Sequence, residues 1–272
     1  MTKPAISRAE ELSFFSRRFS LSPKEILEFV KHYNSDFSQY DNHIYEHIGS
    51  RIAHWWNFET HDWFAKRIDI YLDYLEKITS DPRARVFLLD IGFSIPYVFS
   101  RHRLVQRNNL SCLLVDKERS AKRFFYAVRD HLKVTRVGLD QVMVADIERP
   151  DDRKQLLEQI RELGAKQRPN QLLLAGSEVI EHLDDPEAFW MLADAIKLRR
   201  SGQINIYATL PIGKKIPSHT LEFLTAADAF EYLSARLNIR DKWFLKPPAR
   251  KLTSPYLQEC VCVLGTLKKV ST

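Results

Sequence analysis

The sequence predicts an α/β protein with a mostly parallel, seven-stranded sheet that follows a helical N-terminal module. Three apolar runs of the chain each end in an acid, at Asp90, Asp116 and Asp146. A fourth apolar run, 172–175, is followed shortly by Glu178. Successive acids stand 26, 30 and 32 residues apart, near the roughly 30 residues that a strand, its crossover helix and the turns require. Each strand is therefore expected to deliver one acid to the same edge of the sheet, where ligands of open α/β sheets bind.

Residues 1–82 are expected to form the helical module. Ser7, with Glu10 three residues later, has the spacing of a capping box at the start of a helix. Ser22 followed by Pro23 marks a second start, because proline fits the first helical position. Helical spacing of apolar residues predicts two further helices, at 42–57 and 61–79. A turn-forming tripeptide at 80–82 is expected to end the module.

Residues 83–272 are expected to form the sheet and its crossover helices, because apolar runs and amphipathic stretches alternate there. The expected strands span 85–90, 110–116, 141–146, 172–175, 204–210, 241–245 and 259–267. The expected helices span 96–107, 120–132, 151–163, 186–198 and 225–237, the last with Thr225 as its N-cap.

The composition indicates a folded, reduced protein without a membrane segment. Hydrophobic residues make up 44% of the 272 residues, and the chain has no apolar run of about 18 residues. The N-terminus lacks the apolar core of a signal peptide, so a cytoplasmic location is expected. Cys112, Cys260 and Cys262 are too few for a disulfide framework and are expected to be buried thiols. The net charge of +6 is spread along the chain, so a nucleic-acid partner is only weakly indicated and is not favoured.

The acids lie in motifs that resemble those of class I S-adenosylmethionine-dependent methyltransferases. Asp90-Ile91-Gly92 resembles the glycine-rich first motif that follows the first strand. Residues 178–183 resemble the motif after the fourth strand almost letter for letter. The resemblance covers about residues 83–272, and it implies a Rossmann-like methyltransferase sheet whose last strand is antiparallel.

The resemblance also implies that S-adenosylmethionine is the cofactor, and it indicates which residues bind it. Asp116 stands where the family holds the two ribose hydroxyls. Asp146 and Ile147 match the pair that reads the adenine, the carboxylate through the exocyclic amine and the apolar side chain by packing on the ring. The expected cofactor site is completed by Asp90, Gly92 and Glu178.

The first motif departs from the family pattern. Family members usually have glycines where this chain has Ser94 and Pro96. Glycine permits a positive φ and a close approach of ligand to backbone, whereas proline fixes φ and removes a donor. Cofactor binding is still expected because the acids of the other motifs are present. A non-catalytic binding module on a decayed methyltransferase fold is the alternative that these two residues leave open.

The expected function is methyl transfer to an oxygen or nitrogen of a small molecule, in a biosynthetic pathway. His182, in the fourth motif, and His219, after the fifth strand, are the candidate catalytic residues, because an imidazole can take a proton from a hydroxyl acceptor. The helical module 1–82 resembles the lids of small-molecule methyltransferases; packing on the back of the sheet is the competing interpretation. The acceptor and the oligomeric state are left open.

Two groups of residues raise the question of a metal. His43 and His47 are one helical turn apart, but no third ligand stands at a matching spacing, so no metal is expected there. The second group resembles the metal ligands of methyltransferases that modify the terminal 2′-hydroxyl of small RNAs, which makes a metal-dependent RNA 2′-O-methyltransferase the main alternative. The same sequence string is common in small-molecule members that bind no metal, so none is expected. This second group consists of Glu178, Glu181, His182 and His219.

Several classes of enzyme are excluded by missing motifs. The chain has no Asn-Pro-Pro-Tyr after the fourth strand, which argues against amino methylation of adenine or glutamine. It has no cysteine near the fourth or fifth strand ends for a thiol adduct with cytosine. It also has no P-loop, and residues 92–97 lack the Gly-x-Gly-x-x-Gly of dinucleotide-binding oxidoreductases.

Overall fold

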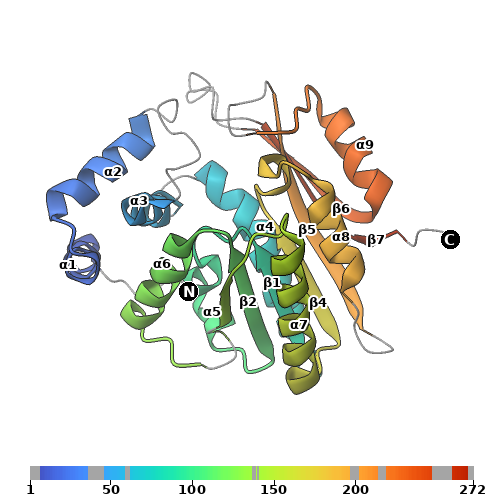
Figure 1. Ribbon diagram of the computed structural model, residues 1–272, viewed down its shortest axis with the longest axis horizontal. Coiled ribbons are helices and arrows are strands. Elements are labelled where there is room, and N and C mark those ends of the chain that lie inside the picture. The colour runs from blue at the N-terminus through green and yellow to red at the C-terminus, as the bar shows by residue number, and fades with distance from the viewer. Residues whose placement is uncertain are drawn as a thin grey trace.

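The computed structural model describes residues 7–35, 46–58, 62–136, 139, 141–196, 202–213, 219–246 and 259–268. Within them the chain forms one seven-stranded sheet with helices on both faces (Figure 1). The predicted α/β fold class is therefore confirmed.

The N-terminal part is helical, as predicted. Its helices are α1 (Arg8–Phe19), α2 (Pro23–Ser35), α3 (Ile48–Phe58) and α4 (Asp62–Thr79). Both predicted helix starts are confirmed. Ser7 Oγ accepts from the Glu10 amide at 3.2 Å while the Ser7 amide donates to Glu10 Oε2 at 2.8 Å, which is a capping box. Ser22 and Glu25 make the same reciprocal pair at the start of α2.

The sheet has the order β3-β2-β1-β4-β5-β7-β6. All strand pairs from β3 to β5 are parallel, and β7 is antiparallel to both of its neighbours. The antiparallel last strand was predicted from the family resemblance and is confirmed. The strands are β1 (Val86–Ile91), β2 (Leu110–Asp116), β3 (Gln141–Val144), β4 (Gln171–Gly176), β5 (Gln203–Ile212), β6 (Leu237–Leu245) and β7 (Glu259–Leu267).

The longer helices after β1 lie close to their predicted positions. They are α6 (Arg119–His131), α7 (Pro150–Gln167), α8 (Glu187–Ala195) and α9 (Ala226–Arg236). Thr225 caps α9, as predicted, with its hydroxyl accepting from the Asp228 amide at 3.2 Å. Because α9 ends at Arg236, β6 begins four residues before the predicted start of this strand.

The single helix predicted over 96–107 is wrong. A 3-10 helix, η3 (Tyr97–Ser100), and a short helix, α5 (His102–Val105), replace it. Arg101 between them has extended backbone, with φ −108° and ψ 96°. Its side chain forms ion pairs with three acids of α4: Asp69, Asp73 at 3.1 Å and Glu76 at 3.9 Å. These ion pairs accompany a break that the helical periodicity of the segment does not reveal.

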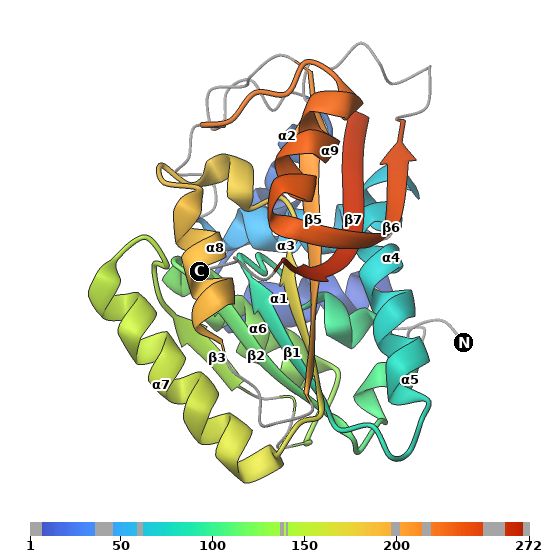
Figure 2. The same cartoon turned by 90° about the vertical axis from the view of Figure 1, so that its right-hand side faces the viewer.

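Helices cover both faces of the sheet, with α4 and α5 on one side and α7 on the other (Figure 2). Each face has its own apolar core. Successive residues of β1 alternate between the cores, because side chains of a strand point to opposite faces. Leu88 belongs to the core that also contains residues of α1 to α6, whereas Leu89 belongs to the core that contains residues of α7, α8 and α9. The N-terminal helices thus share one continuous core with the sheet.

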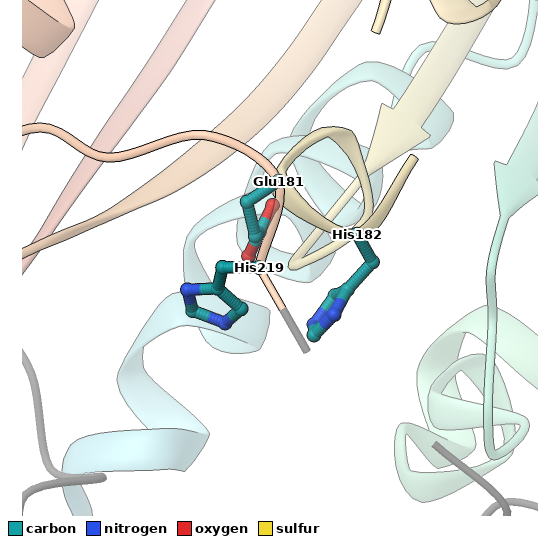
Figure 3. Close-up of side chains that lie close together, drawn as sticks. All are labelled: Glu181, His182 and His219. Carbon is teal, nitrogen blue, oxygen red and sulfur yellow. The ribbon is translucent and has the colours of Figure 1, made fainter. Parts of the chain in front are cut away.

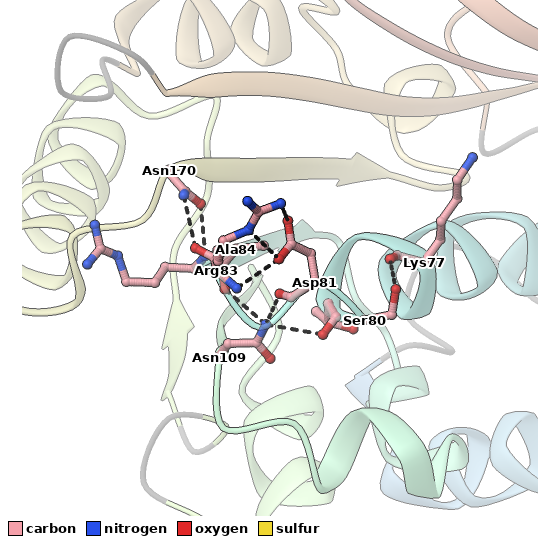
Figure 4. Close-up of polar contacts among 9 residues, drawn as sticks. Lys77, Ser80, Asp81, Arg83, Ala84, Asn109 and Asn170 are labelled. Carbon is pink, nitrogen blue, oxygen red and sulfur yellow. Dashed lines mark hydrogen bonds and ion pairs between the residues drawn. The ribbon is translucent and has the colours of Figure 1, made fainter.

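The predicted end of the N-terminal module, 80–82, is tied to the start of the sheet (Figure 4). The side-chain Nδ2 of Asn109 donates to the carbonyl oxygens of Thr79, Asp81 and Ala84 at 3.1, 3.0 and 2.9 Å. Asn170 Oδ1 accepts from the Arg85 amide at 2.8 Å. These contacts connect the chain before β1 to the segments before β2 and β4, at the edge opposite the acids.

Candidate functional site

The carboxyl edge of the sheet collects the predicted cofactor residues. Asp90 is the second-to-last residue of β1, Asp116 ends β2, and Glu178 follows β4. Asp146, the last residue of the predicted third strand, lies after the end of β3, and Ile147 follows it. The Asp146 amide leaves the ladder and donates to Asp152 Oδ2 at 2.9 Å. Parallel pairing places these positions along one edge, in the spatial order β3, β2, β1, β4.

Asp90 is a buried acid, with only 3% of the residue exposed. The Tyr71 hydroxyl of α4 donates to Asp90 Oδ2 at 3.3 Å. Burial raises the pKa of Asp90 to about 8, the hydrogen bond from Tyr71 opposes this shift, and the nearby charge of Asp116 adds to it. In the ligand-free protein at neutral pH the Asp90 carboxyl is therefore mostly protonated.

We expect this shift to make the free energy of unfolding depend on pH. Because the folded pKa lies above the unfolded value of about 3.9, the folded state holds an extra proton between about pH 4 and pH 8. Stability from this group is full below that window and falls as pH rises through it, by up to about 1.4 kcal/mol per pH unit. Urea unfolding of the wild type and of Asp90→Asn from pH 5 to 8.5 should show the wild type losing stability relative to the variant. Parallel pH profiles would contradict the shift, and the exposed Asp151→Asn serves as the control.

The loop after β1 has two residues with left-handed backbone. Gly92 has φ +66°, and a Cβ built there would lie 2.4 Å from Val179 Cγ2. A side chain at this position is therefore disfavoured both by the backbone conformation and by the contact with Val179. The Gly92 amide donates to the Val115 carbonyl at 2.7 Å, which ties the loop to the end of β2. Ser94 has φ +48°, a conformation that non-glycine residues rarely adopt.

Asp116 is held by backbone amides at both oxygens. Oδ1 accepts from the Glu118 amide at 2.8 Å, and Oδ2 accepts from the Ser94 amide at 3.2 Å. Arg51 Nη1, from α3, lies 3.6 Å from Oδ2. The side chain therefore has a fixed orientation at the end of β2. Ile147, predicted to pack on the adenine ring, is buried beside Asp146.

Glu178 forms a polar cluster with Arg67 and Thr209 at the carboxyl edge of the sheet. Its carboxylate pairs with Arg67 Nη1 of α4 at 2.5 Å and accepts from Thr209 Oγ1 of β5 at 3.0 Å. Burial raises the pKa of Glu178, but the Arg67 charge and the hydrogen bonds outweigh burial, so the pKa is lowered. Its predicted cofactor contact is untested; in this structure its charge faces Arg67. Glu178 also has left-handed backbone, with φ +56°.

The two candidate catalytic histidines lie together, with Glu181 between them (Figure 3). The rings of His182 and His219 have centroids 4.7 Å apart and are nearly perpendicular. The loop carrying His219 is held against the 3-10 helix η5 (Ile180–His182), because the Thr220 amide donates to the Glu181 carbonyl at 2.6 Å. One ligand atom from each of the three residues lies within 4.8 Å of the others, a spacing that fits a metal ion.

Glu181 itself is fully buried, and among the described residues neither of its carboxylate oxygens has a hydrogen-bond partner. Burial raises the pKa of Glu181 well above its usual range, and the charge of Glu178 raises it further. A buried carboxyl without a partner is costly. It is therefore a group that a cation or a donor from a ligand would stabilise.

Sequence reasoning did not single out Arg51, Arg67 and Tyr71, which reach the site from α3 and α4. The structure adds His54 of α3, which is buried and whose ring bonds Ser94 Oγ and the Tyr97 hydroxyl. The periodicity of α3 and α4 identifies helices but not their tertiary neighbours. A charged residue on an otherwise apolar helical face was the available signal.

A cavity of about 990 Å³ lies away from this site, at the opposite edge of the sheet between α7 and α8. Its floor is apolar and includes Phe87 and Leu172, and Arg161 and Arg168 lie on its rim. None of the predicted site residues lines it. The candidate site is therefore defined by its side chains and not by this cavity.

The other expectations have mixed outcomes. All three cysteines are buried and free, as predicted. His43 lies outside the described residues, so the expectation that His43 and His47 bind no metal stays a prediction. Among the residues that the structure describes, no helix combines the length and the apolar composition needed to cross a membrane.

Comparison with solved structures finds proteins that share the fold. The N-methyltransferase NodS from Bradyrhizobium japonicum WM9, in complex with S-adenosyl-L-homocysteine, is 12% identical with a TM-score of 0.45, and the match covers 79% of this chain and 92% of NodS. The N-terminal domain of EvdMO1 with S-adenosylhomocysteine bound is 16% identical (TM-score 0.41, 73% and 80% covered). The [4+2]-cyclase SpnF is 10% identical (TM-score 0.48, 73% and 80% covered).

No protein-family model matches the chain, and no curated protein matches it in sequence. At identities of 10–16% the structural likeness concerns the fold alone. What the structure itself shows is a mostly parallel, seven-stranded α/β sheet, with the strands in the order described above.

Proposed function

We propose that this protein is an S-adenosylmethionine-dependent methyltransferase that acts on an oxygen or nitrogen of a small molecule. The observation that carries the proposal is the alignment of the motif acids on four neighbouring strands at one edge of the sheet. Asp116 and Asp146 give this edge the acidic character that suits a cationic cofactor. The buried Asp90 and the left-handed Gly92 fit the first motif of the family.

The residues divide the binding of the cofactor among them. Asp116 would accept hydrogen bonds from the ribose hydroxyls, Asp146 would accept from the adenine amine, and Ile147 would pack on the ring. The cofactor supplies a methyl group that is already activated by its sulfonium. The protein has only to align donor and acceptor and to exclude water.

The acceptor would be met by the loops after β4 and β5. His182 and His219 are adjacent there, and either ring can take the proton of a hydroxyl as the methyl group is transferred. The N-terminal helices would cover the acceptor, because α3 and α4 already reach the edge through Arg51 and Tyr71.

Calorimetric titration with S-adenosylmethionine and S-adenosylhomocysteine tests the proposal. Saturable binding of both ligands, without added metal, supports it. If neither ligand binds, the non-catalytic binding module on a decayed methyltransferase fold is the better description. If the protein does bind both ligands, it can be screened for methyl transfer to candidate small-molecule acceptors.

A second candidate function is favoured by the buried, unpartnered carboxyl of Glu181 beside two histidines. A divalent ion bound by Glu181, His182 and His219 could hold adjacent hydroxyls, as expected of a metal-dependent RNA 2′-O-methyltransferase. Glu178 is the fourth residue of that predicted set, but its carboxylate is paired with Arg67. The residues therefore fit an ion with three protein ligands, which leaves positions open for substrate.

Thermal unfolding with added Mn²⁺, Co²⁺ or Zn²⁺ distinguishes the two candidates. If the ion binds the folded state, its stabilisation is about 2.7 kcal/mol at a concentration one hundred times the Kd, which raises the Tm by several degrees. The increase should vanish in Glu181→Gln and persist in the exposed control Glu231→Gln. Equal Tm shifts in the wild type and Glu181→Gln, or no shift at all, would argue against a metal site at Glu181 and in favour of the metal-independent function.

A further inference from the structure

Ser94 stands in the first-motif loop with a backbone conformation that normally requires glycine. Its φ of +48° lies in the left-handed region, where a Cβ is unfavourable. Such a conformation persists only when the surroundings hold it. The chain has to supply by side-chain contacts what glycine supplies by its conformational freedom.

Every polar atom of Ser94 has a partner. Arg51 Nη1 donates to the Ser94 carbonyl at 3.0 Å and to Ser94 Oγ at 2.9 Å. His54 Nδ1 lies 3.1 Å from the same hydroxyl. The Ser94 amide donates to Asp116 Oδ2 at 3.2 Å. The conformation of the loop and the orientation of the predicted ribose-binding acid are thus connected through one residue.

The two side chains that hold Ser94 are themselves fixed. Both come from α3, one helical turn apart, so their heads lie on the same face of the helix. Arg51 is 1% exposed and its Nε lies 3.3 Å from Ser120 Oγ of α6. His54 Nε2 lies 3.0 Å from the Tyr97 hydroxyl of η3.

The protonation state of His54 suits this arrangement. Burial, the charge of Arg51 and the charge of Arg67 lower the pKa of His54 to about 3. The ring is therefore neutral, with one nitrogen as donor and the other as acceptor. Since Ser94 Oγ already accepts from Arg51, its hydrogen can be donated to Nδ1, which leaves the Nε2 hydrogen for Tyr97.

We propose that Arg51 and His54 are positioning residues for cofactor binding: through Ser94 they hold the loop 92–95 and Asp116 in the binding conformation. The N-terminal module is then part of the cofactor site. Its helix α3 compensates for the glycine that the first motif lacks. This inference rests on the proposed function.

Rescue by glycine tests the inference. S-adenosylhomocysteine is titrated into the wild type, Arg51→Met, His54→Gln, and each of these combined with Ser94→Gly. We expect each single variant to weaken binding, by about tenfold or more for Arg51→Met. Because glycine adopts the left-handed conformation unaided, adding Ser94→Gly should restore most of the loss in His54→Gln. In Arg51→Met it should restore part of the loss, because this variant also removes the ion pair of Arg51 with Asp116. The exposed Arg123→Met is the matched control, and thermal unfolding of every variant verifies folding.

Other outcomes would overturn the inference. If Ser94→Gly restores nothing, the two side chains act on something other than the loop conformation. A parallel titration with 5′-methylthioadenosine, which lacks the amino-acid end, detects a direct contact: if Arg51→Met weakens only the binding of S-adenosylhomocysteine, Arg51 reads that end of the ligand. If Arg51→Met fails to fold, the His54→Gln pair decides alone. A wild type that binds neither ligand refutes the proposed function instead.

Discussion

Asp116→Asn is expected to lose nearly all affinity for S-adenosylhomocysteine. The substitution keeps the size of the side chain and an oxygen that can accept from the Glu118 amide. It removes the negatively charged carboxylate whose two oxygens would accept hydrogen bonds from the ribose hydroxyls. Hydrogen bonds to charged groups contribute about 1.5–3 kcal/mol each. We therefore expect the Kd to rise roughly 100-fold or more, beyond the range of a micromolar titration.

Isothermal titration of the two proteins measures this loss directly. The exposed Asp151→Asn, at the start of α7, should bind as the wild type does. Because Asp116 also accepts from the Ser94 amide, the Tm of Asp116→Asn must be measured alongside. A variant that is folded and binds within about threefold of the wild type would show that another group holds the ribose.

Arg67→Met is expected to destabilise the protein by about 3–5 kcal/mol. The side chain of Arg67 is 3% exposed and that of Glu178 is 22% exposed, and their charged groups are 2.5 Å apart. Removing one partner of a buried ion pair leaves the other charge uncompensated. Urea unfolding at pH 7 measures the change in the free energy of unfolding.

A second substitution identifies the cause of this loss. Arg67→Met combined with Glu178→Gln removes both charges, so the double variant should regain a large part of the lost stability. Arg83→Met, which breaks an ion pair of a 90% exposed arginine, should change stability by about 0.5 kcal/mol or less. If the double variant is no more stable than Arg67→Met, the loss comes from packing and not from the uncompensated Glu178 charge.

The strands could be predicted from sequence because their signal is local. Strands buried on both faces read as continuous apolar runs, and those of β1, β2 and β4 were located within two residues. The helix caps of α1 and α9 were predictable for the same reason, because a cap depends on residues three positions apart. The prediction of a single helix over 96–107 was wrong because the break at Arg101 accompanies ion pairs with α4, whose residues are distant in the sequence.

The candidate site was predictable only as far as it lies at strand ends. The βα period places Asp90, Asp116 and Glu178 at one edge, and the loop after the next strand brings His219 to His182. The contributions of α3 and α4 could not be predicted. Which residues of a helix face the sheet edge is decided by how the helix packs, and a single sequence does not contain that information.

The position of β7 has a consequence for how the chain is made. This last strand lies between β5 and β6 and pairs with both. Until residues 259–267 leave the ribosome, the long and almost fully buried β5 has one unpaired edge, and β6, among the described strands, has no partner at all. An apolar open edge of this kind invites pairing with other chains. The nascent chain therefore exposes this aggregation-prone edge until residues 259–267 have been made, and the pairing of β7 with both β5 and β6 then covers it.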